Sequence, residues 1–551
     1  MDTYSPVEGG LAWCFDAATL RRHDKPGPRY TSYPTAPHFH EAFGETDFTA
    51  ALARSNGQAR ALSLYVHVPF CSSPCFYCGC NRIISRDRSR GHAYVARVLA
   101  EADLVASHID PSREVIQLHL GGGTPNFLTR EAMSELLQGL RRRFRFSTSA
   151  VRDFSIELDP RFIDRDDVAL LAELGFNRAS LGVQDFDPAV QASINRLQGV
   201  EQTLDILQAC RDHGMRSVNV DLIYGLPGQN EQGFGRTLEQ VLALRPDRLA
   251  VYGYAHLPQL FRAQRQIDES RLPAPEQKLA LLGLAVERLL QAGYQYIGMD
   301  HFALPEEDLS RAQRAGQLHR NFMGYTTHAD TDLLGLGVSA ISTVASSYSQ
   351  NPRDLPAWEA AVDAGHLPVW RGVQLDQDDL LRAEIIQQLM CHGHVDVAAV
   401  CAARGIVFEA YFADALVQLQ ALQADGLAEL DEGTVRATKR GARCFACWRC
   451  ALTATCRGRD SRRVTRVPCE ASGVLASGSG ARSRDRTGKT LRSADFKSAA
   501  STSFAIRAAR HRVHHGARIW NGGARAWNRD QMRGMGRSAV NNALFMPYSA
   551  S

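Results

Sequence analysis

The sequence lacks any long hydrophobic run. In 551 residues there is no stretch of about eighteen consecutive apolar residues, so no membrane-spanning helix is expected. The first residues also lack a basic segment followed by an apolar one, so no signal peptide is expected and the predicted location is cytoplasmic. Clustered cysteines in that reducing compartment favour metal ligation over disulfide bonds. No internal sequence repeat is visible either.

Most of the chain also lacks excess positive charge. The formal net charge is +4, but residues 441–551 contain 21 of the 63 Lys and Arg and only 5 of the 59 Asp and Glu. The first 440 residues therefore carry 42 basic against 54 acidic side chains. A mildly acidic chain offers no electrostatic attraction for phosphate backbones, so no nucleic-acid partner is expected there.

Three closely spaced cysteines are the most informative feature that is present. Cys71, Cys75 and Cys78 follow an apolar, strand-like run at residues 61–70. Three thiolates on one loop would hold three irons of a four-iron cluster and leave the fourth iron free to bind a small molecule. Zinc ligation or disulfide formation is the alternative, because such spacing is common to both. Cys80 could be a fourth ligand, although its one-residue gap from Cys78 makes joint ligation awkward.

Short apolar runs alternate with amphipathic, helix-patterned stretches over most of the chain. Repeated strand–helix units predict parallel strands with right-handed crossovers, and an incomplete or full barrel fits better than an open doubly wound sheet. Residues 300–370 are expected to be irregular. Residues 375–440 look helical and end in a short strand pair, which suggests a small winged-helix-like domain. The predicted strands are 62–68, 115–120, 153–158, 178–183, 217–223, 248–254 and 294–298.

Polar or glycine residues follow six successive predicted strands. Ligands of parallel α/β folds bind beyond the carboxyl ends of the strands, so these residues predict one large polar pocket beside the cysteines. Glycines let backbone amides approach a ligand closely. An open iron next to a pocket that can hold an amino acid suggests S-adenosylmethionine as cofactor. The residues are the cysteine loop, Gly121–Thr124, Glu157 and Asp159, Gln184 and Asp185 with Arg196, Asp221, and Tyr254–His256.

Several longer motifs resemble one family. From about residue 28 to about residue 438 the chain is similar to the oxygen-independent coproporphyrinogen III oxidases (dehydrogenases) of the radical S-adenosylmethionine superfamily. The matching stretches are Gly-Pro-Arg-Tyr-Thr-Ser-Tyr-Pro-Thr at 27–35, Tyr-Val-His-Val-Pro-Phe-Cys at 65–71, Cys-Gly-Cys-Asn at 78–81, Gly-Val-Gln-Asp-Phe at 182–186, Gly-Met-Asp-His-Phe-Ala at 298–303 and Asn-Phe-Met-Gly-Tyr-Thr-Thr at 321–327.

The resemblance implies a set of cofactor sites. It implies an α/β fold with an incomplete (β/α)6-type barrel, extra strands and a small, mostly helical C-terminal domain. One [4Fe-4S] cluster would be held by Cys71, Cys75 and Cys78, and two molecules of S-adenosylmethionine would bind. The molecule on the cluster would meet Tyr65, Gly122, Glu157, Ala255 and Ile341. The second would meet Tyr77, Gly123, Thr124, Gln184, Arg196 and Asp221.

The resemblance also implies a reaction and its partners. Two propionate side chains of coproporphyrinogen III would lose hydrogen and carbon dioxide and become vinyl groups, giving protoporphyrinogen IX. The partners would be this substrate and a reducing electron donor such as flavodoxin, and the protein would be a monomer. Arg29 is a candidate for binding propionate, with a surface ion pair as its alternative. A haem-delivering relative without decarboxylase activity is the alternative function.

The composition changes after about Lys439 and suggests four parts. These are an N-terminal segment at 1–60, a catalytic barrel with its extension at 61–370, a C-terminal helical domain at 371–440, and a basic tail at 441–551. In the tail, Cys444, Cys447 and Cys450 imitate a metal motif. One choice of codons gives an amphipathic helix in another reading frame, so the hypothesis is a frameshift near residue 440. A disordered basic arm is the alternative.

Overall fold

A sheet of parallel strands forms the framework of the described chain. The computed structural model describes residues 32–438. Arg29 and the tail cysteines therefore lie outside the described residues. Six strands run parallel and lie side by side in chain order. They are β1 (Ala61–Val68), β4 (Glu114–Gly122), β6 (Asp153–Leu158), β7 (Arg178–Gln184), β8 (Ser217–Tyr224) and β9 (Arg248–Gly253).

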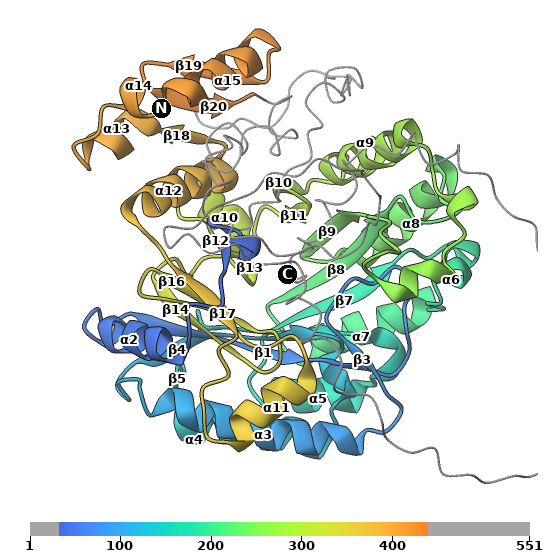
Figure 1. Ribbon diagram of the computed structural model, residues 1–551. Coiled ribbons are helices and arrows are strands. Elements are labelled where there is room, and N and C mark those ends of the chain that lie inside the picture. The colour runs from blue at the N-terminus through green and yellow to red at the C-terminus, as the bar shows by residue number, and fades with distance from the viewer. Residues whose placement is uncertain (1–31, 439–551) are drawn as a thin grey trace, which may run out of the picture. The chain divides into compact units, whose positions relative to one another are not determined.

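Each of these strands is followed by a helix before the next strand. Figure 1 shows the helices lying outside the strands. The strands are buried almost throughout, as parallel strands covered on both faces must be. Local signals define the helix ends: the Thr129 hydroxyl, for example, accepts a hydrogen bond from the Ala132 amide at the start of α4. The helices are α3 (Ser89–Ala106), α4 (Arg130–Arg143), α5 (Arg165–Glu173), α7 (Val200–Asp212), α8 (Glu231–Leu244) and α9 (Pro275–Gln291).

The extra strands extend this sheet at both ends. The spatial order of the strands across the sheet is β10-β11-β9-β8-β7-β6-β4-β1-β14-β15-β16-β17, with β5 (Arg145–Phe146) beside β4. Strand β14 (Thr331–Leu336) is parallel to β1 and β5 is parallel to β4, whereas the strands added at the two ends beyond them pair antiparallel. These are β10 (Gln295–Gly298), β11 (His301–Ala303), β15 (Ile341–Val344), β16 (Ser347–Gln350) and β17 (Arg371–Gln374). The predicted six-unit barrel with extra strands is confirmed.

The expectation that residues 300–370 are irregular is wrong. This stretch contains β11, α10 (Asp308–Arg314), the hairpin of β12 (His319–Asn321) and β13 (Gly324–Thr326), β14 to β16, and α11 (Leu355–Asp363). Most of these strands have only three or four residues, too few to show a period of two in the sequence. Their pairing with distant strands defines them. The seventh predicted strand, 294–298, exists as β10 but lies antiparallel at the sheet edge.

Residues 377–437 contain the predicted helices and strand pair. They are α12 (Gln377–His392), α13 (Val397–Ala402), α14 (Phe408–Tyr411) and α15 (Ala413–Ala424), with β18 (His394–Asp396), β19 (Ala428–Asp431) and β20 (Thr434–Ala437). The three strands form one antiparallel sheet in the order β18-β20-β19. A hydrophobic cluster from Leu381 to Val435 gives this region a core of its own. Apart from short 3-10 turns, the remaining elements of the described chain are the α-helices α2 (Glu45–Asn56) and α6 (Pro188–Ser193) and the parallel pair β2 (Phe70–Cys71) and β3 (Ile83–Ile84).

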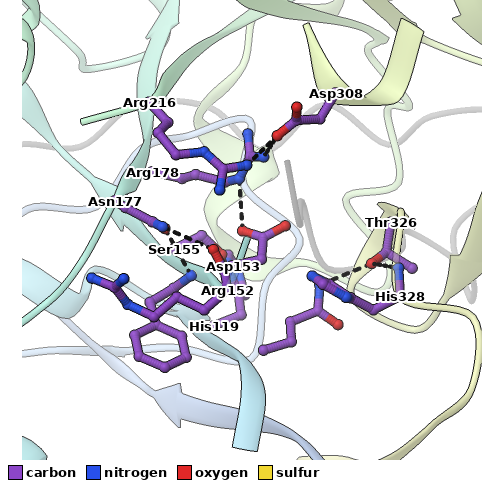
Figure 2. A network of polar contacts seen from close by, with 12 residues as sticks. His119, Arg152, Asp153, Ser155, Asn177, Arg178, Arg216, Asp308, Thr326 and His328 are labelled. Carbon is purple, nitrogen blue, oxygen red and sulfur yellow. Dashed lines mark hydrogen bonds and ion pairs between the residues drawn. The ribbon is translucent and has the colours of Figure 1, made fainter. Parts of the chain in front are cut away.

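A buried ionic network connects the amino ends of the parallel strands. Figure 2 shows Arg178, the first residue of β7, joined to Asp153 of β6 and to Asp308 of α10. Arg178 Nη1 also lies 2.9 Å from Glu307 Oε1, and Arg248 Nη2 lies 2.5 Å from the same oxygen. Buried charges remain ionised only when such partners compensate their lost hydration. The network therefore occupies the end of the strands opposite the one where ligands of such folds bind.

Within residues 32–438 no helix is both long and apolar enough to cross a membrane.

Candidate active site

A cavity of about 420 Å³ lies at the carboxyl ends of the parallel strands. Its wall combines the cysteine loop after β1, the glycine turn after β4, and side chains from the ends of β6, β7 and β8. The predicted convergence of these strand ends on one pocket is confirmed. Twelve of the fourteen predicted site residues line the cavity: Cys71, Tyr77, Cys75, Cys78, Gly122, Gly123, Thr124, Glu157, Gln184, Arg196, Asp221 and Ile341.

Tyr65 and Ala255 are the two predicted residues that do not line the cavity. Tyr65 is 4% exposed and lies behind the wall, where its hydroxyl is 3.1 Å from His67 Nδ1. His67 Nε2 in turn lies 2.9 Å from the carbonyl oxygen of Asn81 in the cysteine loop. The Ala255 carbonyl accepts a hydrogen bond from Gln264 Nε2 at 3.2 Å. Tyr65 and Ala255 are therefore connected to the cavity wall through the hydrogen bonds of other residues, His67 and Gln264.

The cysteine loop is fixed at both ends. Its first cysteine belongs to β2, which pairs with β3 immediately after the loop. In the middle, the Phe76 amide donates to the Ile194 carbonyl at 2.9 Å, and Asn195 Nδ2 donates to the Pro74 carbonyl at 2.7 Å. The Arg82 guanidinium donates to the Cys75 carbonyl at 2.9 Å. These contacts hold a loop that has little regular structure of its own.

The thiols face polar partners across the cavity. The Thr124 hydroxyl lies 3.3 Å from Cys71 Sγ, and guanidinium nitrogens of Arg161 and Arg196 each lie 3.6 Å from Cys75 Sγ. Both arginines also pair with Asp159, at 2.7 and 3.0 Å. These contacts place a hydroxyl and two guanidinium groups beside two of the three cysteine sulfurs.

The donor set suits a cluster better than a single zinc ion. Among the described residues, no three Cys, His, Asp or Glu side chains are grouped closely enough to hold one metal ion. A zinc ion needs all its ligand atoms within about 2.3 Å of one point. An iron–sulfur cluster of four irons is larger, and thiolates placed around a cavity can each bind a different iron. Cys80 is exposed and also lines the cavity, and its amide lies 3.4 Å from Cys78 Sγ.

The glycine turn brings backbone close to the cysteine loop. Gly122 has φ +115°, and its amide donates to Glu157 Oε2 at 3.1 Å. A Cβ on Gly122 would lie 2.4 Å from the His67 ring. The amide of Gly123 donates to the Val68 carbonyl at 2.8 Å. Only glycine permits this combination of backbone angle and close approach.

Asp221 is the most electrostatically perturbed carboxyl of the cavity wall. Burial raises its pKa to about 7, and the nearby Glu157 carboxylate adds to the rise. Its oxygens accept hydrogen bonds from Asn219 Nδ2 at 2.8 Å and from the Ser180 hydroxyl at 3.2 Å. A carboxyl of raised pKa at a cavity wall is poised to bind a cationic group, because that group would restore its ionised form.

Sequence reasoning missed several residues of the site. Gln264 lies behind the wall, fully buried, and donates to the carbonyls of Tyr77 at 2.9 Å and Ala255 at 3.2 Å, so one side chain connects two predicted site positions. Arg353 and Arg371 line the cavity. No local pattern marks these three residues in the sequence. His301, His319 and His328 do not line the described cavity.

Comparison with known protein families first shows to which superfamily the chain belongs. Residues 65–241 match the radical SAM superfamily, and residues 375–443 match the HemN C-terminal domain. With the cysteine loop and the parallel strands, the class is that of the radical S-adenosylmethionine proteins, which use a [4Fe-4S] cluster and S-adenosylmethionine.

Relatives then define the family. The chain is 48% identical to the oxygen-independent coproporphyrinogen III oxidase of Pseudomonas aeruginosa over 427 residues, which cover 78% of this chain and 93% of the relative. It is 46% identical to that of Escherichia coli strain K12, over 78% of this chain and 92% of the relative. The solved Escherichia coli coproporphyrinogen III oxidase, described as a radical SAM enzyme, superposes with a TM-score of 0.76 at 43% identity and covers 80% of this chain and 99% of that one. The chain belongs to the oxygen-independent coproporphyrinogen III oxidase family.

Proposed function

We propose that this protein catalyses the oxygen-independent oxidative decarboxylation of coproporphyrinogen III. Two propionate side chains become vinyl groups and the product is protoporphyrinogen IX, in haem biosynthesis. The observation that carries the proposal is the single cavity shared by Cys71, Cys75 and Cys78 with the glycine turn and the strand-end acids. It occurs in a chain 48% identical to a relative named for this activity.

The three cysteines would hold the cluster, and the strand ends would hold the cofactor molecules. When bound, the cluster and S-adenosylmethionine supply a carbon radical that removes a hydrogen atom from the substrate. For the cofactor molecule at the cluster we assign Tyr65, Gly122, Glu157, Ala255 and Ile341. For the second we assign Tyr77, Gly123, Thr124, Gln184, Arg196 and Asp221. In support, nine of these eleven residues line the cavity, and the other two contact its wall residues or their neighbours.

The protein's own groups would bind and orient the charged parts of the cofactors. Glu157 and Asp221 offer carboxylates to amino or sulfonium groups, while Arg196, held by Asp159, offers a cation to a carboxylate. The side chains of Phe322, Ile341 and other apolar residues complete the wall. Such a lining limits the water that could quench a reactive radical.

The parts of the chain and the partners are proposed in the same way. Residues 61–370 form the catalytic part and residues 371–440 a C-terminal domain, in agreement with the separate hydrophobic cluster there. The substrate is coproporphyrinogen III, and the reducing electron comes from a small donor such as flavodoxin. We further propose that the protein is a cytoplasmic monomer.

Anaerobic assay of the reconstituted protein tests the function. With a strong reductant, S-adenosylmethionine and coproporphyrinogen III, the protein should release carbon dioxide and form protoporphyrinogen IX. The Cys75→Ser variant should release none, because the cluster loses one of its three protein ligands. Haem binding by the wild-type protein without any release of carbon dioxide would instead support the haem-delivery function.

A further inference from the structure

Two arginines on the cavity wall form no ion pair with an acidic side chain of the described chain. Arg353 and Arg371 both line the cavity that contains the cysteine loop. Within residues 32–438 neither one forms an ion pair. Arg371 is half-buried, so its charge is only partly solvated, whereas Arg353 is exposed. An anionic ligand would compensate the partly desolvated charge of Arg371 and would also be attracted by Arg353.

The other two arginines of the described cavity wall, Arg82 and Arg196, are engaged with the cysteine loop and its surroundings. Arg196 pairs with Asp159 at 3.0 Å, and Arg82 donates to the backbone carbonyl of Cys75 at 2.9 Å. Their guanidinium groups are already used to hold the cysteine loop and its surroundings. Arg353 and Arg371 are the arginines of the described wall that neither pair with an acidic side chain nor donate to the cysteine loop.

The register of two neighbouring strands orients Arg371. It is the first residue of β17 and lies opposite Gln350 of β16. Its Nε donates to Gln350 Oε1 at 2.8 Å, and its guanidinium carbon lies 4.4 Å from the centre of the Trp370 ring. A stacked and hydrogen-bonded guanidinium is held in one orientation, which lowers the entropy cost of binding a carboxylate.

Arg353 lies close enough to Arg371 for its charge to affect the pKa of Arg371. Burial, followed by the charge of Arg353, lowers the pKa of Arg371 to about 10. The Glu41 carboxylate opposes this effect only in part. The backbone carbonyl of Arg353 accepts a hydrogen bond from Asn81 Nδ2 at 3.1 Å, so the pair adjoins the end of the cysteine loop.

We propose that Arg353 and Arg371 bind the propionate carboxylates of the tetrapyrrole that are not being converted. This inference rests on the proposed function and names the residues that select the substrate. Guanidinium groups match carboxylates in shape and charge, and two of them can hold two carboxylates of one molecule. The pair would thereby orient the ring so that another propionate lies toward the cysteine loop.

Porphyrin binding tests this proposal without turnover. Coproporphyrin, the stable oxidised and fluorescent analogue, and its tetramethyl ester are titrated into the anaerobically reconstituted full-length protein. Wild type should bind the free acid more tightly than the ester. Arg371→Gln and Arg353→Gln should each weaken free-acid binding about tenfold or more, since a hydrogen bond to a charged group is lost. Ester binding should not change, and Arg371→Lys should recover part of the affinity.

A matched control separates charge in the cavity from charge elsewhere. Arg97 pairs with Asp363 on the protein surface at 2.9 Å, so Arg97→Gln removes one positive charge at a distance from the wall and should bind both porphyrins as wild type does. In turnover, the cavity variants should raise KM for coproporphyrinogen III far more than they lower kcat. Equal loss of acid and ester binding, or no loss at all in either variant, would overturn the proposal.

The outcome is distinguishable from failure of the proposed function. If the wild-type protein discriminates acid from ester but releases no carbon dioxide, the arginine site stands and the decarboxylase function fails. If it releases carbon dioxide and the arginine variants bind and turn over coproporphyrinogen as wild type does, the function stands and the arginine site fails.

Discussion

Replacing Gly123 with alanine should disturb the cysteine loop through the backbone. A Cβ at this position would lie 2.6 Å from the Pro69 carbonyl oxygen and 2.8 Å from the Phe70 carbonyl oxygen. These are main-chain atoms of the two residues directly before Cys71, so no flexible side chain can move aside. The chain entering the loop, or the glycine turn itself, must shift.

The cost can be estimated from this overlap. Forcing an extra methyl group into a well-packed region typically costs about 1 to 3 kcal/mol. In a domain of this size each kcal/mol lowers the melting temperature by about 2 to 4 °C. We therefore expect the Gly123→Ala apoprotein to melt several degrees below wild type. We also expect less iron per chain after anaerobic reconstitution, because Cys71 moves relative to Cys75 and Cys78.

A second glycine provides the control for this experiment. Gly199 has φ −76°, and a Cβ placed there would have no atom within 4 Å. Gly199→Ala should therefore melt and take up iron like wild type. The two assays are thermal unfolding by circular dichroism and chemical determination of bound iron. If Gly123→Ala gives the wild-type result in both, the close approach between the glycine turn and the cysteine loop is wrong.

Two further changes test buried charges away from the cysteine loop. Asp332→Ala removes the carboxylate that lies 2.5 Å from the Arg113 guanidinium, and both side chains are only 2% exposed. Urea unfolding should show that the free energy of unfolding falls by about 3 to 5 kcal/mol, because a buried guanidinium is left without its ionic partner. A decrease of less than about 1 kcal/mol would contradict this. The pKa of Asp221 is about 7 in the folded protein and 3.8 in the unfolded chain, so the folded state keeps the Asp221 proton up to a higher pH. The free energy of unfolding of the apoprotein should then fall by about 4 kcal/mol as pH rises between about 4 and 7, and remain level above that. Asp221→Asn should remove this part of the pH dependence. If the free energies of unfolding of wild type and Asp221→Asn change in parallel between about pH 4 and 7, the raised pKa of Asp221 is refuted.

The success at the strand ends has a simple physical origin. Apolar runs that are buried on both faces are visible in the sequence, and the polar residue that follows each run must lie at the carboxyl end of its strand. Glu157, Gln184 and Asp221 were therefore predicted as neighbours although they are far apart in the chain, and all three line the cavity. Tyr65 and Ala255 were assigned through the family resemblance and not from a strand-end pattern; they do not line the cavity, and their contact with a cofactor stays a prediction.

The strands between residues 300 and 350 show where sequence patterns fail. Strands of three or four residues contain too little periodicity to predict, and β15 to β17 exist because each pairs with a neighbour. The orientation of Arg371 depends on that pairing, through Gln350. Its place on the cavity wall beside Arg353 therefore had no signal in the sequence.

By itself, the sequence determined the three-cysteine loop, the succession of parallel strands and the polar residues that follow them. These are properties of short, continuous segments, in which spacing and hydrophobic pattern act directly. Only the tertiary structure decided which of those residues form the cavity wall, which arginines of the described chain pair with Asp159 and which form no ion pair. Those outcomes depend on contacts between separate strands and loops, as between Arg196 and Asp159. The distance between two charges, not their order in the chain, sets their interaction energy.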